Sequence, residues 1–261
     1  MKQQLLQMDI DKYLHRIDVS AREQPGVRFL KHLHYQHLLH IPFENLDIHW
    51  GKEILLDTER LYKKIIEQKR GGFCYELNGL FYSLLTQLGF TCYMASARMP
   101  KPDGNLSPEF EHMCILVQLA GEVFLCDVGY GKGPVYPLKV LEENIQMSLN
   151  QFYRIRKKDE VGWWLDESDD GQAFEEKYLF SPKRRTLIEF IPRCLYQQTD
   201  PESHFRNGKM ITQATPEGRK TLTEKMLIVN SRGKRTEHYL LNEDDFYIKL
   251  EEHFNIHRST N

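Results

Sequence analysis

In the stretch Arg70-Gly71-Gly72-Phe73-Cys74-Tyr75-Glu76-Leu77-Asn78, a glycine pair leads into a cysteine at the head of an apolar run. After Cys74, apolar residues recur at the three- and four-residue spacing of a helix face, at Leu77, Leu80, Phe81, Leu84, Leu85 and Leu88. This period predicts a buried helix that begins at Cys74 and that Gly89 ends. The cysteine is therefore expected in the first turn of a core helix, directly after a Gly-Gly break.

The predicted position of Cys74 suits a nucleophile. A thiol reacts as its thiolate, and the unpaired N–H groups and the dipole at a helix N-terminus favour negative charge. The other four cysteines lie in apolar, strand-like runs, and we interpret them as small buried side chains: Cys92, Cys114, Cys126 and Cys194. Five is an odd number and no C-x-x-C pair occurs, which argues against a disulfide framework or a zinc site and for reduced thiols inside a cell.

A cysteine nucleophile needs a base for its proton and a third group that orients the base. His112 begins a strand-like run, and Ala120-Gly121 then predicts a tight turn into a second run that ends at Asp127. With a two-residue loop, Asp127 would stand opposite Cys114, on the face that also carries His112. The backbones of His112 and Asp127 would then be diagonal neighbours, roughly 7–8 Å apart, within reach of an imidazole–carboxylate hydrogen bond. The alternative, that Asp127 only starts a turn before the next glycine, stays open.

Four further histidines fall in one predicted helical stretch and raise the question of a metal site: His32, His34, His37 and His40. No cysteine or carboxylate ligand pattern accompanies them, so we interpret them as core or solvated helix positions and expect no metal ion.

The hydrophobic period changes along the chain and divides it into three parts. Helical periodicity dominates up to residue 89, with helices expected over 11–19 and 27–39 and a third that Thr58 caps. From Phe90 the pattern becomes strand-like, over 92–99, 112–119, 123–127, 152–155, 163–165 and 187–191. The last part combines two strand-like runs, 225–230 and 235–240, with a helical run over 242–254. We therefore expect an α+β fold made of parts 1–89, 90–198 and 199–261.

Composition places the chain among ordinary soluble globular proteins. Of its 261 residues, 41% are hydrophobic and 28% are charged, and the net charge is −2. The lack of a basic excess argues against nucleic acid as a partner. No apolar run approaches the roughly 20 residues that span a bilayer, and the start, Met1-Lys2-Gln3-Gln4-Leu5-Leu6, lacks the apolar core of a signal peptide. We expect a cytoplasmic protein with no membrane partner.

Five motifs in register resemble the arylamine N-acetyltransferase family of prokaryotic type. Residues 70–78 are similar to the family's R-G-G-x-C-x-E-x-N, and His112 lies at the place of its triad histidine. The other four are Tyr13-Leu14-His15-Arg16-Ile17 for Y-x-x-R-I, Ile41-Pro42-Phe43-Glu44-Asn45 for I-P-F-E-N, Asp127-Val128-Gly129-Tyr130-Gly131 for D-V-G-F-G, and Thr215 to Leu222 for T-x-x-G-x-x-T-L. Together they cover nearly the whole chain in the family's order, which makes the resemblance very specific.

The resemblance implies a helical bundle, a central β-barrel and a C-terminal α/β lid, on a core like that of transglutaminases and papain-like cysteine proteases. It implies acetyl-CoA as a co-substrate, with no permanently bound cofactor, and an arylamine, arylhydrazine or N-arylhydroxylamine as the acceptor of N- or O-acetylation. In this ping-pong chemistry Cys74 would carry the acetyl group. His112 would form an ion pair with Cys74 and later take the amine proton, and Asp127 would orient the imidazole.

Further expectations follow from the same resemblance. Phe43 and Tyr130 would border the acceptor pocket. Three groups around the nucleophile would support it without reacting: Arg70, Glu76 and Asn78. The protein would be a monomer or a weak homodimer.

The chain also departs from the family pattern. Tyr130 stands where Phe is commoner, and residues 99–111 do not closely match the donor-binding loop. Two acids, Glu109 and Glu111, precede His112 where an anionic donor would pass, so we assign no CoA-contacting residues. An amide synthase or a thiol hydrolase with the same triad is the alternative, which acetyl transfer from acetyl-CoA to an aniline would separate. A non-catalytic binding module is a further alternative, which thiol labelling at neutral pH would separate.

Overall fold

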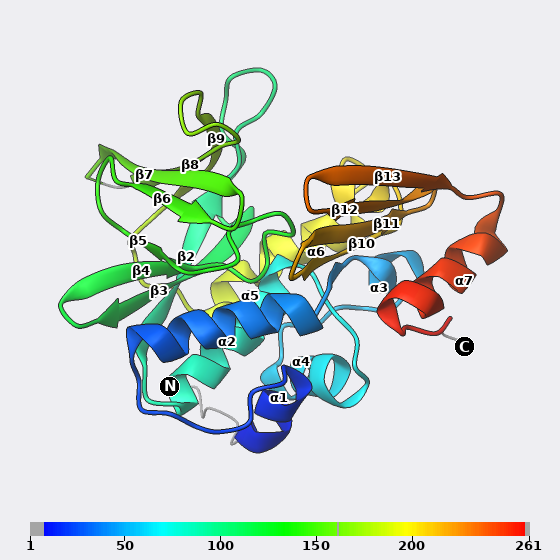
Figure 1. Cartoon of the computed structure of the whole chain (residues 1–261), viewed down its shortest axis with the longest axis horizontal. Coiled ribbons are helices and arrows are strands. Elements are labelled where there is room, and N and C mark those ends of the chain that lie inside the picture. The colour runs from blue at the N-terminus through cyan, green and yellow to red at the C-terminus, as the bar shows by residue number, and fades with distance from the viewer. Residues whose placement is uncertain (1–7, 161, 259–261) are drawn as a thin grey trace.

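The structure of the protein is a computed structural model that describes residues 8–160 and 162–258. Figure 1 shows a helical part, a curled sheet and a flatter sheet beside the C-terminal helix, all meeting near the centre of the molecule. This is the α+β arrangement that the sequence predicts. The division at residues 89/90 and 198/199 stays a prediction. Residues 1–7, on which the expectation about a signal peptide rests, lie outside the described residues.

Helices form the first part of the chain, because apolar residues recur there on one face of each segment. They are α1 (Ile10–Arg16), α2 (Val27–His40), α3 (Leu46–His49), α4 (Thr58–Tyr62), the π-helical turn η1 (Lys63–Glu67) and α5 (Cys74–Gln87). Helix α5 begins at Cys74, as predicted, and buries all residues from Cys74 to Leu85 except Tyr82. The expected cap of α4 is off by one residue, since the Asp57 side chain accepts from the N–H of Arg60 at 3.0 Å.

Eight antiparallel strands form the second part and curl into a nearly closed barrel (Figure 1). In sheet order they are β5 (Leu138–Lys139), β4 (Glu122–Cys126), β3 (His112–Leu119), β2 (Thr91–Arg98), β9 (Glu175–Phe180), β8 (Gly162–Ser168), β7 (Gln151–Asp159) and β6 (Ile145–Ser148). Successive side chains of β3 alternate between two cores: Met113 and Ile115 join the helical core, whereas Cys114 and Leu116 join the barrel core. Strand β3 is therefore apolar on both faces.

A five-stranded antiparallel sheet forms the third part, in the order β1 (Phe43–Glu44), β10 (Met210–Thr215), β11 (Gly218–Thr223), β12 (Met226–Ser231) and β13 (Lys234–Tyr239). Helix α7 (Glu243–Phe254) buries Phe246 and Leu250 against Ile211 and Leu222 of this sheet. Because β1 belongs to the I-P-F-E-N segment, the sheet ties the neighbourhood of the nucleophile to the C-terminal part of the chain.

The strand expected over 187–191 is wrong. These residues form the 3₁₀ turn η2 (Leu187–Phe190), which continues into α6 (Ile191–Thr199), and a second 3₁₀ turn, η3 (His204–Arg206), follows. Thr186 and Glu189 make a capping box, in which the N–H of Thr186 donates to the Glu189 carboxylate at 2.6 Å, and a proline lies in the first turn of α6. This T-x-x-E and proline signal for a helix start outweighs the apolar run that suggested a strand. Six strands were not expected: β1, β5, β6, β9, β10 and β11.

None of the helices within residues 8–160 and 162–258 is long and apolar enough to cross a membrane.

Candidate active site

Cys74 is the first residue of α5, and glycines allow two other segments to approach it closely. A Cβ on Gly71 would lie 2.0 Å from the carbonyl oxygen of Pro42, so only glycine at this position leaves room for the I-P-F-E-N segment. A Cβ on Gly129 would lie 2.7 Å from the Cα of Cys74. The turn after β4 therefore packs directly against the first turn of α5, which brings Asp127 and Tyr130 to the thiol.

Strands β3 and β4 form the hairpin that the sequence predicts. Leu119 pairs with Glu122 across the two-residue loop Ala120-Gly121, whose φ angles of 53° and 78° are those of a type I′ turn. This register places His112 and Asp127 on one face of the hairpin. Nε2 of His112 lies 2.6 Å from Oδ2 of Asp127, and both side chains are buried. The expected hairpin geometry is confirmed.

The carboxylate of Asp127 is held by four donors. Oδ2 faces Nε2 of His112 and accepts the hydroxyl of Tyr178 at 2.9 Å, while Oδ1 accepts Nδ2 of Asn78 at 2.9 Å and the N–H of Gly129 at 3.0 Å. Burial opposes ionisation, but His112 and these hydrogen bonds outweigh it and hold the pKa of Asp127 below its usual value. The bond from the N–H of Gly129 is the one expected if Asp127 only starts a turn. The same carboxylate therefore starts the turn and also pairs with His112.

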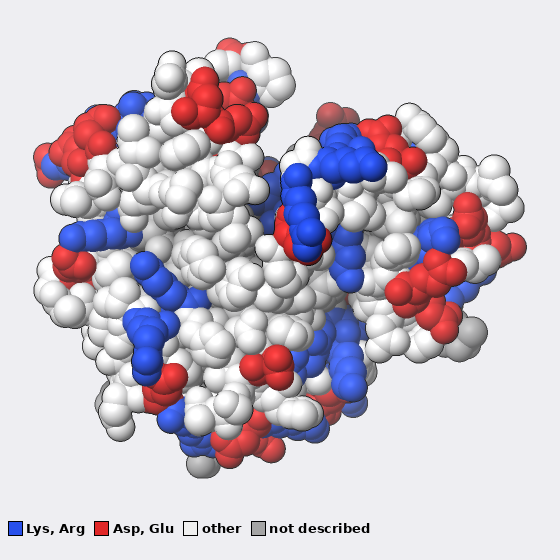
Figure 2. All heavy atoms as spheres, viewed as in Figure 1, with Lys and Arg blue, Asp and Glu red and all other residues white. Residues whose placement is uncertain are grey.

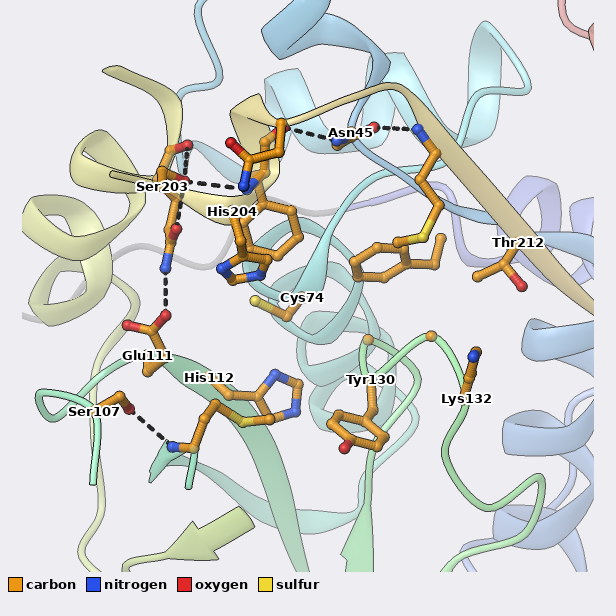
Figure 3. Close-up of a pocket in the computed structure, with 18 of the residues that line it drawn as sticks. Asn45, Cys74, Ser107, Glu111, His112, Tyr130, Lys132, Ser203, His204 and Thr212 are labelled. Carbon is orange, nitrogen blue, oxygen red and sulfur yellow. Dashed lines mark hydrogen bonds between the residues drawn. The ribbon is translucent and has the colours of Figure 1, made fainter. Parts of the chain in front are cut away.

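His112 and Cys74 face the same space from β3 and α5 (Figure 3). With Nε2 engaged by Asp127, only Nδ1 of the imidazole is left to meet the thiol. Burial raises the pKa of the Cys74 thiol well above its usual value, and the charge of Asp127 adds to the rise. Such a thiol gives up its proton only to a base whose positive charge then stays beside the sulfur. The geometry makes His112 the candidate for that base.

Two residues that sequence reasoning missed hold Asp127 from outside the hairpin. Tyr178 reaches it from β9, and Nε2 of His34 on α2 accepts the N–H of Asp127 at 3.0 Å. His34 is a core histidine, as expected for that helix, and the structure adds its contact with Asp127. No signal in one sequence pairs either residue with Asp127, because α2 and β9 are far from it along the chain.

Arg70 and Glu76 belong to a buried charge cluster, here the α5 cluster, made of Glu44, Asp47, Lys64, Arg70 and Glu76. Arg70 contacts Glu44 at 2.6 Å and Asp47 at 3.0 Å, and Lys64 contacts Asp47 at 2.7 Å and Glu76 at 2.8 Å. Three carboxylates thus surround two cations. Burial raises the pKa of Glu76 to about 7, whereas the carboxylates outweigh the burial of Lys64 and raise its pKa. The cluster therefore keeps Lys64 charged and takes up one proton near neutral pH.

The α5 cluster is joined to the backbone beside the nucleophile. Oε2 of Glu76 accepts the N–H of Phe73, the residue before Cys74, at 3.1 Å. Asn78 acts on the other side of the first turn, where its Nδ2 contacts Asp127 and its Oδ1 accepts the N–H of Val128 at 3.0 Å. Arg70, Glu76 and Asn78 therefore lie around the first turn of α5, next to Cys74. This is the position expected for groups that support the nucleophile without reacting.

A cleft of about 1340 Å³ opens at the triad, between the barrel and the five-stranded sheet. Cys74 and His112 line it, and so do both residues expected in the acceptor pocket, Phe43 and Tyr130. The ring of Tyr130 packs edge-on against His112 with centroids 5.6 Å apart. Figure 3 shows the hydroxyl of Tyr130 pointing away from Cys74, so its ring rather than its hydroxyl borders the thiol.

The two acids before His112 are both paired. Glu111 forms an ion pair with Arg193 of α6 and accepts Nε2 of Gln197 at 2.7 Å, and Glu109 forms an ion pair with Arg185. Neither acid therefore presents an uncompensated charge to an anionic ligand.

Three lysines line the cleft and make no ion pair within residues 8–160 and 162–258: Lys101, Lys132 and Lys225. Figure 2 shows Lys and Arg side chains at the notch between the barrel and the five-stranded sheet. The described part of the chain holds no group of three or more His, Cys, Asp or Glu residues placed to bind a metal ion.

Comparison with known proteins agrees with this geometry. A model of the N-acetyltransferase family matches residues 27–261. The arylamine N-acetyltransferase / N-hydroxyarylamine O-acetyltransferase of Salmonella typhimurium is 30% identical over 81% of this chain and 75% of its own length. The solved arylamine N-acetyltransferase from Salmonella typhimurium has a TM-score of 0.90 and 27% identity, over 95% of this chain and 90% of that one.

The Mycobacterium marinum arylamine N-acetyltransferase, solved in complex with CoA, is similar to the same degree, with a TM-score of 0.88 and 28% identity over 95% of this chain and 93% of that one. Family match, sequence identity and fold therefore agree along almost the entire length of the chain. The chain belongs to the arylamine N-acetyltransferase family.

Proposed function

We propose that the protein transfers an acetyl group from acetyl-CoA to an arylamine, arylhydrazine or N-arylhydroxylamine by way of an acetyl thioester on Cys74. The observation that carries this proposal is the constellation at the floor of the cleft. A buried thiol at a helix N-terminus faces an imidazole, and that imidazole lies 2.6 Å from a carboxylate with four donors. A cysteine, a base and a group that orients the base are the components of nucleophilic acyl transfer.

In the first half-reaction the proton of Cys74 moves to Nδ1 of His112, and the thiolate attacks the carbonyl carbon of the acetyl group. The new S–C bond forms as the bond to the CoA sulfur breaks, and CoA leaves as a thiol with the proton from His112. Asp127 stabilises the imidazolium while it exists. We assign the oxyanion to backbone N–H groups beside Cys74, because the first turn of a helix has N–H groups without carbonyl partners.

In the second half-reaction the amine nitrogen of the acceptor attacks the acetyl carbon on Cys74. Its proton passes to His112, the S–C bond breaks, and the thiolate of Cys74 is regenerated. Phe43 and the ring of Tyr130 line the cleft beside the sulfur and offer faces on which an aryl ring can pack. The acceptor would thus be held with its nitrogen toward the thioester.

The cleft also suits a large anionic donor. Its volume of about 1340 Å³ exceeds the roughly 300–1,000 Å³ typical of sites for one drug-sized molecule, which fits a nucleotide-bearing donor. We propose that Lys132 and Lys225 receive the phosphate groups of CoA, since both ammonium groups border the cleft without an ion-pair partner among the described residues.

Mass spectrometry of the protein after brief exposure to acetyl-CoA tests the proposal. One acetyl group should appear on Cys74, should vanish when an arylamine is added, and should be absent from Cys74→Ala, which we expect to fold normally. Acetylation of an aniline by Cys74→Ala would contradict the mechanism. An amide synthase or thiol hydrolase with the same triad would leave the aniline unacetylated, which separates this alternative from the proposed transferase.

We further propose that the protein works in the cytoplasm as a monomer or weak homodimer. Free thiols at all five cysteines support a reducing compartment. Size-exclusion chromatography with light scattering over a range of concentrations measures the oligomeric state.

A further inference from the structure

We propose that His34 is a positioning residue for the triad: from α2 it fixes the backbone of Asp127 and thereby the way in which His112 meets Cys74. This inference rests on the proposed function in so far as the triad performs acetyl transfer. The contacts of His34 stand independently of that function.

The hydrogen bonds of His34 define one tautomer of its ring. Nε2 lies 3.0 Å from the backbone nitrogen of Asp127, and Nδ1 lies 3.0 Å from the carbonyl oxygen of Val135. An N–H group can only donate and a carbonyl can only accept, so Nε2 must be bare and Nδ1 must carry the hydrogen. Both ring nitrogens of this buried side chain are then satisfied.

His34 acts where the β-ladder stops. Strand β4 ends at Cys126, and the next N–H, that of Asp127, donates to the imidazole. Val135 lies eight residues further along, at the other end of the loop that carries Tyr130 into the cleft. The imidazole therefore clamps both ends of this loop. Its ring also packs edge-on against Phe81 of α5, with centroids 6.1 Å apart, which links the loop to the helix that begins with Cys74.

The ring of His34 cannot serve as a proton carrier at neutral pH. Burial lowers its pKa to about 4, despite the carbonyl of Val135 and the charge of Asp127, which act in the opposite direction. A neutral ring with both nitrogens engaged holds geometry and exchanges no proton with the substrate. Its effect on the reaction must pass through Asp127 and His112.

His37 provides a matched control on the same helix. It lies nearly one turn from His34, is equally buried, and packs edge-on against the same Phe81 with centroids 5.1 Å apart. Its Nδ1 faces the hydroxyl of Tyr13 at 3.0 Å, and its Nε2 has no partner. A substitution at His37 therefore removes a similar ring from the same core and leaves Asp127 untouched.

Two substitutions separate the two bonds of His34. In His34→Gln the amide reaches the place of Nε2, and its oxygen can still accept the N–H of Asp127. In His34→Asn the shorter amide reaches only the place of Nδ1, so it can donate to Val135 but leaves the N–H of Asp127 without an acceptor. The matched controls are His37→Gln and His37→Asn.

The deciding measurement is the rate at which iodoacetamide alkylates Cys74 in the full chain between pH 4.5 and 9. We expect His34→Asn to lower the rate at pH 7 at least tenfold and to displace the pH profile, because the imidazolium loses its fixed carboxylate. In His34→Gln and in both His37 variants, we expect the alkylation rate of Cys74 to stay within threefold of the native rate and the pH profile to match that of the native protein. The KM for acetyl-CoA should be unchanged in all four variants. A native profile in His34→Asn, or an equal displacement in His37→Asn, would overturn the proposal.

A second measurement decides the matter even where a variant does not fold. In the native protein labelled with ¹⁵N-histidine, His34 should show a protonated Nδ1 and a bare Nε2 from pH 5 to 8, and the opposite tautomer or an imidazolium would refute the clamp. Failure of the proposed function has a different signature, because Cys74 would then acquire no acetyl group while its alkylation profile would still respond to His34.

Discussion

The hydroxyl of Tyr178 donates at 2.9 Å to the same oxygen of Asp127 that lies 2.6 Å from His112. One carboxylate oxygen therefore joins a phenol from β9 to the imidazole from β3. The rings of Tyr178 and His112 also lie against each other, with centroids 5.1 Å apart. Tyr178 thus fixes both the charge that the imidazolium needs and one side of the ring itself.

Replacing Tyr178 by Phe should slow the reaction and leave the fold intact. The substitution removes one of four donors to a buried carboxylate, and a hydrogen bond to a charged group is worth about 1.5–3 kcal/mol. We expect kcat to fall roughly ten- to a hundredfold with little change in the KM for acetyl-CoA. Tyr153→Phe is the control, since its hydroxyl binds Glu167 at 3.0 Å elsewhere in the same barrel. Equal losses in both variants would show that Tyr178 acts only through stability.

Asp127→Asn should nearly abolish acetyl transfer. The substitution keeps the shape of the side chain but removes the charge that stabilises the imidazolium, and in comparable triads this change costs on the order of 10⁴-fold in kcat. We expect a comparable loss in single-turnover acetylation of Cys74. Asp169→Asn, on an exposed turn, should behave like the native protein. Retention of more than about a tenth of the activity in Asp127→Asn would contradict the role assigned to this residue.

The α5 cluster should make stability depend on pH near neutrality. Glu76 has a pKa of about 7 when folded and about 4.5 when unfolded, so the folded protein binds this proton more tightly. The resulting stabilisation is present below about pH 4.5 and is lost as the pH rises through 7, by up to ~3 kcal/mol. We expect the Tm of the native protein, relative to Glu76→Gln, to fall between pH 5 and 8. Glu59→Gln, at an exposed position on α4, is the control, and a Tm difference that stays constant with pH would contradict the shift.

Lys132 and Lys225 should set the affinity for the donor. Exposed ion pairs are worth up to ~1 kcal/mol each, so Lys132→Met with Lys225→Met should raise the Kd for CoA roughly three- to thirtyfold. The salt dependence of binding should weaken together with the affinity, because fewer charges face the phosphates. Calorimetry with CoA measures both quantities. Lys158→Met, outside this cleft, is the control, and an unchanged Kd in the double variant would remove both lysines from the donor site.

Local sequence determined the elements that carry the reacting groups. The start of α5 at Cys74 follows from a Gly-Gly break and a helical period, both of which lie within some twenty residues. The alignment of His112 with Asp127 follows from a two-residue loop, because a hairpin's turn sets the register of all its pairs. Where two local signals competed, as over 187–191, the capping box prevailed over the apolar run, and the sequence had contained both.

The surroundings of those groups were decided only by the tertiary structure. Asp127 meets Tyr178 across 51 residues of chain and His34 across 93, and Glu111 meets Arg193 across 82. Such contacts depend on how the barrel closes and how α2 and α6 lie against it, and no period or turn in one sequence encodes that packing. A reactive cysteine and its hairpin can therefore be found from local pattern. The charge state and the orientation of the same residues depend on segments that are distant along the chain. Those segments bury the side chains and supply the donors and acceptors that each side chain meets.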